Sequence, residues 1–220
     1  MRANSDYRAE AREALSGRWN ETALMSLIIF ACSLLFSGVS MYDAVAGEGV
    51  VPMKWVGMSD ALNTLVIFLL AGPLEFAMFN VLLQMKRGDL ADTPMMSMFR
   101  FFSKDWARYV VAYVLMTVIV VLISIPTLCI GGIIFAYAYK MVPYLLHDYP
   151  ELSAKEALKL SREMMKGYKW DLFLLDFSFI GWALLAILTL GIGLLWLMPY
   201  IYAAEAGFYE DLKAETVVEE

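Results

Sequence analysis

The stretch that decides the fold is residues 109–147, YVVAYVLMTVIVVLISIPTLCIGGIIFAYAYKMVPYLLH, which is almost continuously apolar apart from Lys140. As a single helix these residues would run to roughly 58 Å, at about 1.5 Å per residue, whereas about 20 residues are enough to cross the hydrocarbon core of a membrane. Pro126 and Gly131-Gly132 lie near the middle of the stretch, and both favour a turn. The sequence therefore predicts a tight helical hairpin.

The rest of the chain has the same character. Residues 171–209 form a second long apolar stretch, broken at Thr189-Leu-Gly-Ile-Gly193, and two shorter stretches are each long enough for one span. Hydrophobic residues make up 60% of the chain and charged residues 18%, which is too apolar for an ordinary soluble domain. We predict an all-α fold, a polytopic transmembrane helical bundle with a single transmembrane domain over residues 1–220. Its six spans, arranged as three helical hairpins, are residues 22–41, 61–85, 109–125, 128–146, 171–188 and 194–209.

The positions of the basic residues support this number of spans. Lys and Arg are concentrated in four segments, which six spans would place on the same side of the membrane. Short cytoplasmic loops carry an excess of Lys and Arg, so we expect both termini in the cytoplasm and a first span that is retained rather than cleaved. The net charge of −6 provides no global positive field to attract nucleic acid, which we exclude as a partner. The four segments are residues 1–20, 86–108, 147–170 and 210–220.

A short amphipathic segment precedes each predicted pair of spans. In the third copy, Ser153 and Glu156 form a capping box, Gly167 can end the helix, and four basic residues project away from the apolar side. The middle copy opens with Thr93 as its N-cap, and the first copy stops at Gly17. We interpret these segments as a threefold structural repeat whose helices lie in the membrane interface, with basic sides among anionic headgroups. The alternative is that they are solvated connectors. The four basic residues are Lys155, Lys159, Arg162 and Lys166.

A longer pattern in the C-terminal half points to a known family. It runs from Met141-Val-Pro-Tyr-Leu-Leu146 through Ser161-Arg162, Lys169-Trp170 and Ser178-Phe-Ile-Gly-Trp182 to Thr189-Leu-Gly-Ile-Gly193, followed by Pro199-Tyr200 and Phe208-Tyr209. In these residues the chain resembles the bacterial family catalogued as domain of unknown function 975. The resemblance implies an integral membrane protein of bacteria and carries no established activity. With no organelle-targeting features in the sequence, it indicates the bacterial cytoplasmic (inner) membrane.

Four ionisable residues fall inside predicted spans, where charged side chains are costly and often functional. A bundle could gather them into a candidate intramembrane polar site, with Lys140 paired to a carboxylate and Glu75 beside the helix break at Gly72-Pro73. In the alternative, Lys140 and Glu205 reach the interface, Asp176 pairs locally, and Glu75 is protonated or bonded to a neighbouring helix, for example through Asn80. We favour the alternative for three of them, and for Glu75 the two interpretations are balanced. The four residues are Glu75, Lys140, Asp176 and Glu205.

These features give three hypotheses for the function. We favour a non-enzymatic membrane protein that organises lipids or partner proteins, because no catalytic arrangement is recognisable in the sequence. The alternative is a small transporter or channel subunit in which Glu75 is an intramembrane proton or cation site. An intramembrane enzyme that uses Asp176, Glu205 or His147 is the least supported.

The expected partners follow from the same reasoning. We expect membrane lipids, and we leave open a protein partner in the membrane or a homo-oligomer. No catalytic residue, cofactor or metal is expected. Cys32 and Cys129 both lie in or beside apolar segments and lack the spacing of a zinc site or a disulfide framework.

Overall fold

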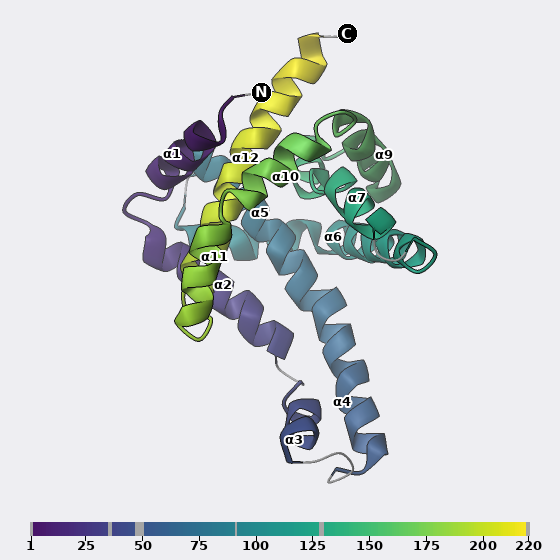
Figure 1. Cartoon of the computed structure of the whole chain (residues 1–220). Coiled ribbons are helices and arrows are strands. Elements are labelled where there is room, and N and C mark those ends of the chain that lie inside the picture. Colours follow the sequence, from purple (N-terminus) through teal and green to yellow (C-terminus); the bar gives the residue numbers. More distant parts are fainter. Residues whose placement is uncertain (1, 35–36, 47–50, 91, 128–129, 219–220) are drawn as a thin grey trace.

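The computed structural model of the chain describes residues 2–34, 37–46, 51–90, 92–127 and 130–218. Within these ranges every regular element is helical, which confirms the all-α prediction. Cys129 and the first two residues of the predicted span 128–146 lie outside the described residues, and Cys32 is a free cysteine. The elements (Figure 1) are α1 (Asn4–Ala14), α2 (Trp19–Leu34), α3 (Gly38–Ala46), α4 (Met53–Val66), the π-helix η1 (Ile67–Ala71), α5 (Gly72–Arg87), α6 (Pro94–Ser124), α7 (Ile130–Ala138), α8 (Val142–Asp148), α9 (Ala154–Met164), α10 (Lys169–Phe177), α11 (Ile180–Leu188) and α12 (Leu194–Val218).

The number of apolar helices that could cross a membrane differs from the prediction. Among the described residues, three helical segments are long and apolar enough: Met53–Arg87, Pro94–Ser124 and Lys169–Leu188. α2 is apolar but has only 16 residues. The expectation of six spans is therefore corrected to three candidate spans, and the reasons lie in where the helices begin and end.

Two of the predicted spans are divided between helices. Span 22–41 runs through α2 and into α3, and span 128–146 is split between α7 and α8 by a turn at residues 139–141. Pro143 accounts for this turn, because proline has no N–H to donate to the Tyr139 carbonyl and its ring clashes with that carbonyl in a continuous helix. Neither half is long enough to cross a membrane alone.

The other predicted spans have different ends from those expected. Span 61–85 belongs to a helix that begins at Met53, so the expected outer loop at residues 42–60 is largely helical. Span 109–125 is the second half of α6, whose 31 residues also include the middle amphipathic segment. Span 171–188 corresponds to α10 and α11, and span 194–209 to the greater part of α12.

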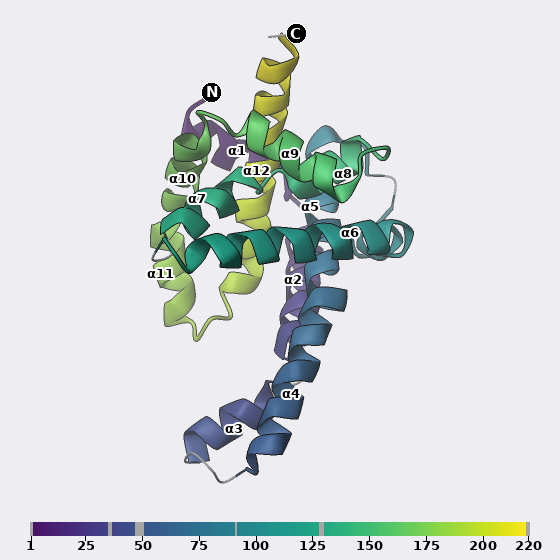
Figure 2. The same ribbon diagram turned by 90° about the vertical axis from the view of Figure 1, so that its right-hand side faces the viewer.

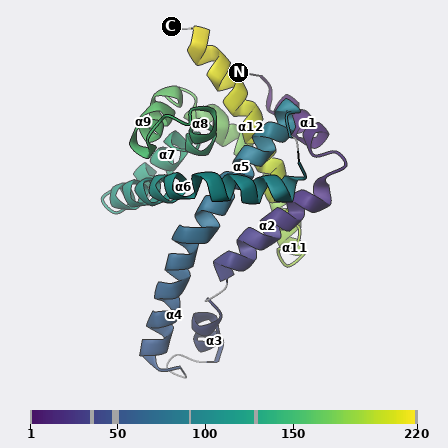
Figure 3. The ribbon, with the colours of Figure 1, turned by 180° about the vertical axis from the view of Figure 1, so that it is seen from behind.

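Most of the long helices follow one axis of the molecule, but α6 does not. α4, η1 and α5 succeed one another along this axis, α12 packs against α5, and both termini lie at the same end (Figures 1 and 2). α6 runs across the axis in every view, including the one from behind (Figure 3). α6 and the α4–α5 segment therefore cannot both lie along a single membrane normal, although each is long enough to span.

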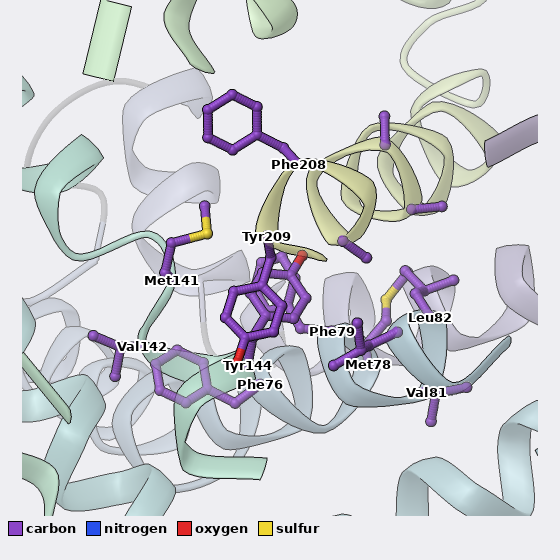
Figure 4. Packing of buried hydrophobic residues seen from close by; sticks show 14 of the residues in the cluster. Phe76, Met78, Phe79, Val81, Leu82, Met141, Val142, Tyr144, Phe208 and Tyr209 are labelled. Carbon is purple, nitrogen blue, oxygen red and sulfur yellow. The ribbon is translucent and has the colours of Figure 1, made fainter. Parts of the chain in front are cut away.

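The core lies between α5, α8 and α12, toward the end of the molecule that carries the termini. Figure 4 shows the aromatic centre of this core, in which the rings of Tyr144 and Tyr209 stack with centroids 5.0 Å apart and Phe79 meets Tyr144 edge-on at 5.5 Å. Aromatic pairs in these geometries add to the free energy gained by burying their rings. Elsewhere large apolar side chains are uncovered, such as Leu122 on α6 and Leu188 on α11, which are 62% and 79% exposed.

The first and third amphipathic segments adopt the same helix–turn–helix geometry. α1 leads to α2 through Gly17 and α9 leads to α10 through Gly167, and both glycines have a positive φ that other residues adopt only with strain. Equivalent backbone hydrogen bonds close the two turns, from Arg18 N to Leu15 O and from Tyr168 N to Met165 O. These bonds confirm the predicted repeat for the first and third copies.

The middle copy departs from the repeat. Thr93 caps α6 as predicted, and its hydroxyl accepts a hydrogen bond from the Met96 N–H at 3.4 Å. No glycine follows, so α6 continues without a turn into the predicted span. This continuity explains how α6 becomes long enough to cross the whole molecule.

α9 has the predicted capping box and the predicted amphipathic character. Ser153 accepts from the Glu156 N–H, and the Glu156 carboxylate accepts from the Ser153 N–H at 2.8 Å. Its apolar side is covered by α6 and α8. The apolar side of α9 is therefore buried by the protein itself, and the basic side is the one left uncovered. All four basic residues on the opposite side are exposed: Lys155, Lys159, Arg162 and Lys166.

Candidate functional site

Lys140 lies at the turn between α7 and α8. The turn leaves the Ala138 carbonyl without its helical partner, because Val142 N–H donates to Tyr139 O instead. The buried Ser161 hydroxyl of α9 donates to this Ala138 carbonyl at 2.8 Å. A buried carbonyl without a donor would be costly, so this hydrogen bond stabilises the turn that places Lys140 opposite α10 and α12.

The Lys140 ammonium binds carboxylates from two other helices. Its Nζ lies 2.9 Å from Asp176 Oδ2 on α10 and 2.7 Å from Glu205 Oε1 on α12. The Glu205 side chain is completely buried, and the Tyr137 hydroxyl of α7 donates to Asp176 Oδ2 at 3.0 Å. We name Tyr137, Lys140, Asp176 and Glu205 the Lys140 cluster. Three of the four ionisable residues thus contact one another, with Glu205 buried and Lys140 and Asp176 partly exposed, whereas we had favoured separate roles for them.

The Lys140 cluster holds more negative than positive charge. Two carboxylates share one ammonium, which leaves a formal charge of −1 when both are ionised. Within the described part of the chain, Asp176 Oδ1 and Glu205 Oε2 are buried without a hydrogen-bond donor. The cluster therefore has an excess of negative charge, which favours one further positive charge beside it.

Glu75 lies on α5 and has a different partner. The Tyr202 hydroxyl of α12 donates to Glu75 Oε1 at 2.6 Å. Asn80, the partner considered from the sequence, instead donates to the Tyr109 hydroxyl of α6 at 2.7 Å. No direct hydrogen bond or ion pair joins Glu75 to the Lys140 cluster among the described residues. The predicted single site is therefore divided into two neighbouring polar groups.

Glu75 lies just after Pro73 and a π-helical segment of its helix, which is continuous from Met53 to Arg87. Proline cannot donate to the carbonyl of Leu69 four residues earlier, and the backbone before it forms the π-helix η1. The Leu69 carbonyl accepts from the Trp106 indole N–H of α6 at 2.7 Å. The break expected at Gly72-Pro73 is thus a π-helical segment inside a helix that is continuous from Met53 to Arg87. The contact between Trp106 and Leu69 depends on the crossing of α6 over η1.

Glu75 and Tyr202 line a pocket of about 480 Å³ between α2, α5 and the beginning of α12. Among the described residues that line the pocket, Glu75 is the only charged one. Mostly apolar walls with a few polar groups are typical of small-molecule sites. The other lining residues are Ser26, Leu27, Ile29, Phe30, Ser33, Met78, Leu190, Gly191, Ile192, Leu194, Leu195 and Met198.

A third polar group, centred on Asp148, was not identified from the sequence. The Arg87 guanidinium donates two hydrogen bonds to Asp148, at 2.7 and 2.8 Å, and Lys213 and Tyr209 donate to Oδ2 at 2.6 and 3.0 Å. Burial opposes ionisation of Asp148, but the bonds from Arg87 and Lys213 outweigh it and hold the pKa of this carboxyl well below its usual range. These bonds tie α5, α8 and α12 together.

His147 precedes Asp148 and takes no part in that network. Its Nε2 lies 3.3 Å from Gln84 Nε2, and its ring meets Phe101 edge-on at 5.0 Å. Burial lowers the pKa of His147 below its usual range, so the imidazole is neutral at pH 7. This environment is that of a packed core histidine.

The regular elements of the described residues are all helical, and three helical segments among them are long and apolar enough to cross a membrane. The model of the family described as "Protein of unknown function (DUF975)" matches residues 1–136 and 113–216. The chain belongs to this family, which confirms the resemblance found in its sequence. No curated protein and no solved structure matches the chain.

Proposed function

We propose that this chain is a non-enzymatic protein of the bacterial cytoplasmic (inner) membrane, with both termini in the cytoplasm, and that it organises anionic lipids at its cytoplasmic end. The three apolar helices found among the described residues and the uncovered apolar side chains of α6 and α11 support embedding in a bilayer. The termini, α1 and α9 lie at one end of the molecule, and the basic residues of this end support its placement in the cytoplasm (Figure 1).

The exposed basic side of α9 carries the proposal. Lys155 and Lys166 are exposed at opposite ends of this side, while the apolar side is packed on the bundle and keeps α9 fixed in orientation. Trp170, which is 65% exposed, follows at the beginning of α10 and is of the type that anchors helices at the headgroup level. A rigid row of cations beside an interfacial tryptophan favours anionic headgroups.

The test measures lipid binding by the purified protein in mild detergent. We expect native mass spectrometry to show retained phosphatidylglycerol or cardiolipin in preference to phosphatidylcholine. Each basic residue near an anionic surface contributes about 1 kcal/mol, so Lys155→Gln with Lys166→Gln should weaken anionic lipid binding by about 30-fold.

The matched control is Lys155→Arg with Lys166→Arg, which keeps both charges and should bind as the wild type does. Equal retention of anionic and zwitterionic lipids by the wild type would contradict the proposal. If a stoichiometric protein co-purified from native membranes in place of anionic lipid, the function would instead be the organisation of partner proteins.

A second candidate function is a small transporter or channel subunit, and the position of Glu75 in a pocket just after the π-helical segment η1 favours it. Glu75→Gln removes the titrating group and keeps its shape. If the protein carries protons, we expect proteoliposomes of the variant to lose proton flux while those of Glu151→Gln, an exposed acid on another segment, keep it. Unchanged flux in Glu75→Gln would remove this candidate.

A further inference from the structure

We propose that the pocket between α2, α5 and α12 binds an apolar organic cation, with Glu75 as its counter-ion. This inference concerns residues other than those of α9 and stands apart from the lipid-organising function. Three properties of the pocket indicate this occupant: the charge of Glu75, the apolar walls and the volume.

The carboxylate of Glu75 is available to a ligand. It lines the pocket, and Tyr202 donates to one of its oxygens, Oε1, at 2.6 Å. Among the described residues no donor is bonded to the other oxygen, Oε2. The Tyr202 ring is held against Phe79, with centroids 4.3 Å apart, so the carboxylate is fixed in position by a packed partner. A ligand in the pocket therefore meets an oriented negative group.

The surrounding charges favour a cation over an anion. Lys140 is the basic residue of the neighbouring cluster, but its ammonium is already paired with Asp176 and Glu205 at 2.9 and 2.7 Å. Glu75 and the cluster together contain three carboxylates and one ammonium, a formal charge of −2 when all are ionised. A carboxylate in apolar surroundings is costly without a counter-ion, and a bound cation supplies one.

The walls select an apolar cation rather than a metal ion. Phe30, Met78 and Leu194 present apolar surface to the pocket, whereas a hard cation such as Mg²⁺ or Ca²⁺ needs several oxygen ligands or its own water shell. Methionine side chains adapt to irregular ligands. A volume of about 480 Å³ is within the range of sites that hold small organic molecules. An organic cation with an apolar body satisfies both the carboxylate and the walls.

Tetraphenylphosphonium and tetraphenylborate test the proposal, because the two ions have nearly the same size and shape and opposite charge. The full chain in detergent micelles is expected to bind tetraphenylphosphonium saturably and tetraphenylborate no better than empty micelles do. Glu75→Gln should weaken tetraphenylphosphonium binding by at least about tenfold, because it removes the charge and keeps the shape. Glu151→Gln, an exposed acid outside the pocket, should bind as the wild type does.

A second variant keeps the test decisive if Glu75→Gln does not fold. Ser33→Phe fills the pocket from α2 without changing a charge, and it should abolish binding in a folded protein. Equal binding of the two ions, or wild-type affinity for tetraphenylphosphonium in both variants, would overturn the proposal and indicate partitioning into the micelle. Displacement of a co-purified phospholipid by both ions alike would also overturn it, since an acyl chain would then be the occupant.

Discussion

Replacement of Lys140 by methionine should lower the free energy of unfolding by about 3–5 kcal/mol, because it leaves a buried carboxylate without its counter-ion. Glu205 is completely buried and has the Lys140 ammonium 2.7 Å from its Oε1. Methionine occupies a similar volume, so lost packing contributes little to the change. Thermal and denaturant unfolding of the detergent-solubilised protein, followed by circular dichroism, measures the effect.

Two further variants distinguish loss of charge pairing from other causes. Lys159→Met removes an exposed lysine of α9 and should change stability by less than about 1 kcal/mol. Combining Lys140→Met with Asp176→Asn and Glu205→Gln removes the uncompensated charges, and we expect it to recover much of the loss. A Lys140→Met protein as stable as the wild type would show that the cluster contributes no net pairing energy.

Asp148→Asn should destabilise the protein by about 3 kcal/mol, because it breaks a largely buried ion pair and leaves Arg87 facing a neutral amide. Its side chain is 5% exposed and joins α5, α8 and α12 through Arg87, Lys213 and Tyr209. The exposed pair between Asp92 and Arg100 serves as the comparison. Asp92→Asn should cost less than about 1 kcal/mol, since solvent screens that pair.

The contribution of Asp148 also depends on pH in a defined direction. Its pKa is lower in the folded protein than its ordinary value of 3.8, so its stabilisation is present above that value and is lost as the pH falls through the folded value. The difference in unfolding free energy between wild type and Asp148→Asn should be constant from about pH 7 to pH 5 and should narrow below about pH 4. A difference that stays unchanged at pH 3 would contradict the assignment of this pKa.

Local features of the chain could be predicted because neighbouring residues determine them. The capping box of α9, the N-cap Thr93 and the turns at Gly17 and Gly167 depend on contacts within a few residues of sequence. The irregularity of the helix before Pro73 is equally local, because proline lacks an N–H. Periodicity and composition were sufficient to identify the helical class.

The arrangement of the helices could not be predicted in the same way. Hydropathy gives only the second half of α6, and it does not give the direction of α6 across the molecule, which follows from packing against α5 and α7. The contacts of Lys140 with Asp176 and Glu205 require the turn before Pro143. Counting apolar residues along the stretch does not reveal this turn. Asp148 was missed for a related reason, since its partners Arg87 and Lys213 are 61 and 65 residues away.

Two carbonyls that lack their helical partners have a consequence for the order of biosynthesis. The Leu69 carbonyl is satisfied by Trp106, 37 residues later in the chain, and the Ala138 carbonyl by Ser161, 23 residues later. Each helix therefore leaves the ribosome with a polar group whose partner has not yet been made. In a bilayer such a group is expensive to leave bare, so it favours retention of the early segment near water or the translocon until the next one arrives. In a membrane, each of these two carbonyls would thus make insertion of its segment wait for the next one.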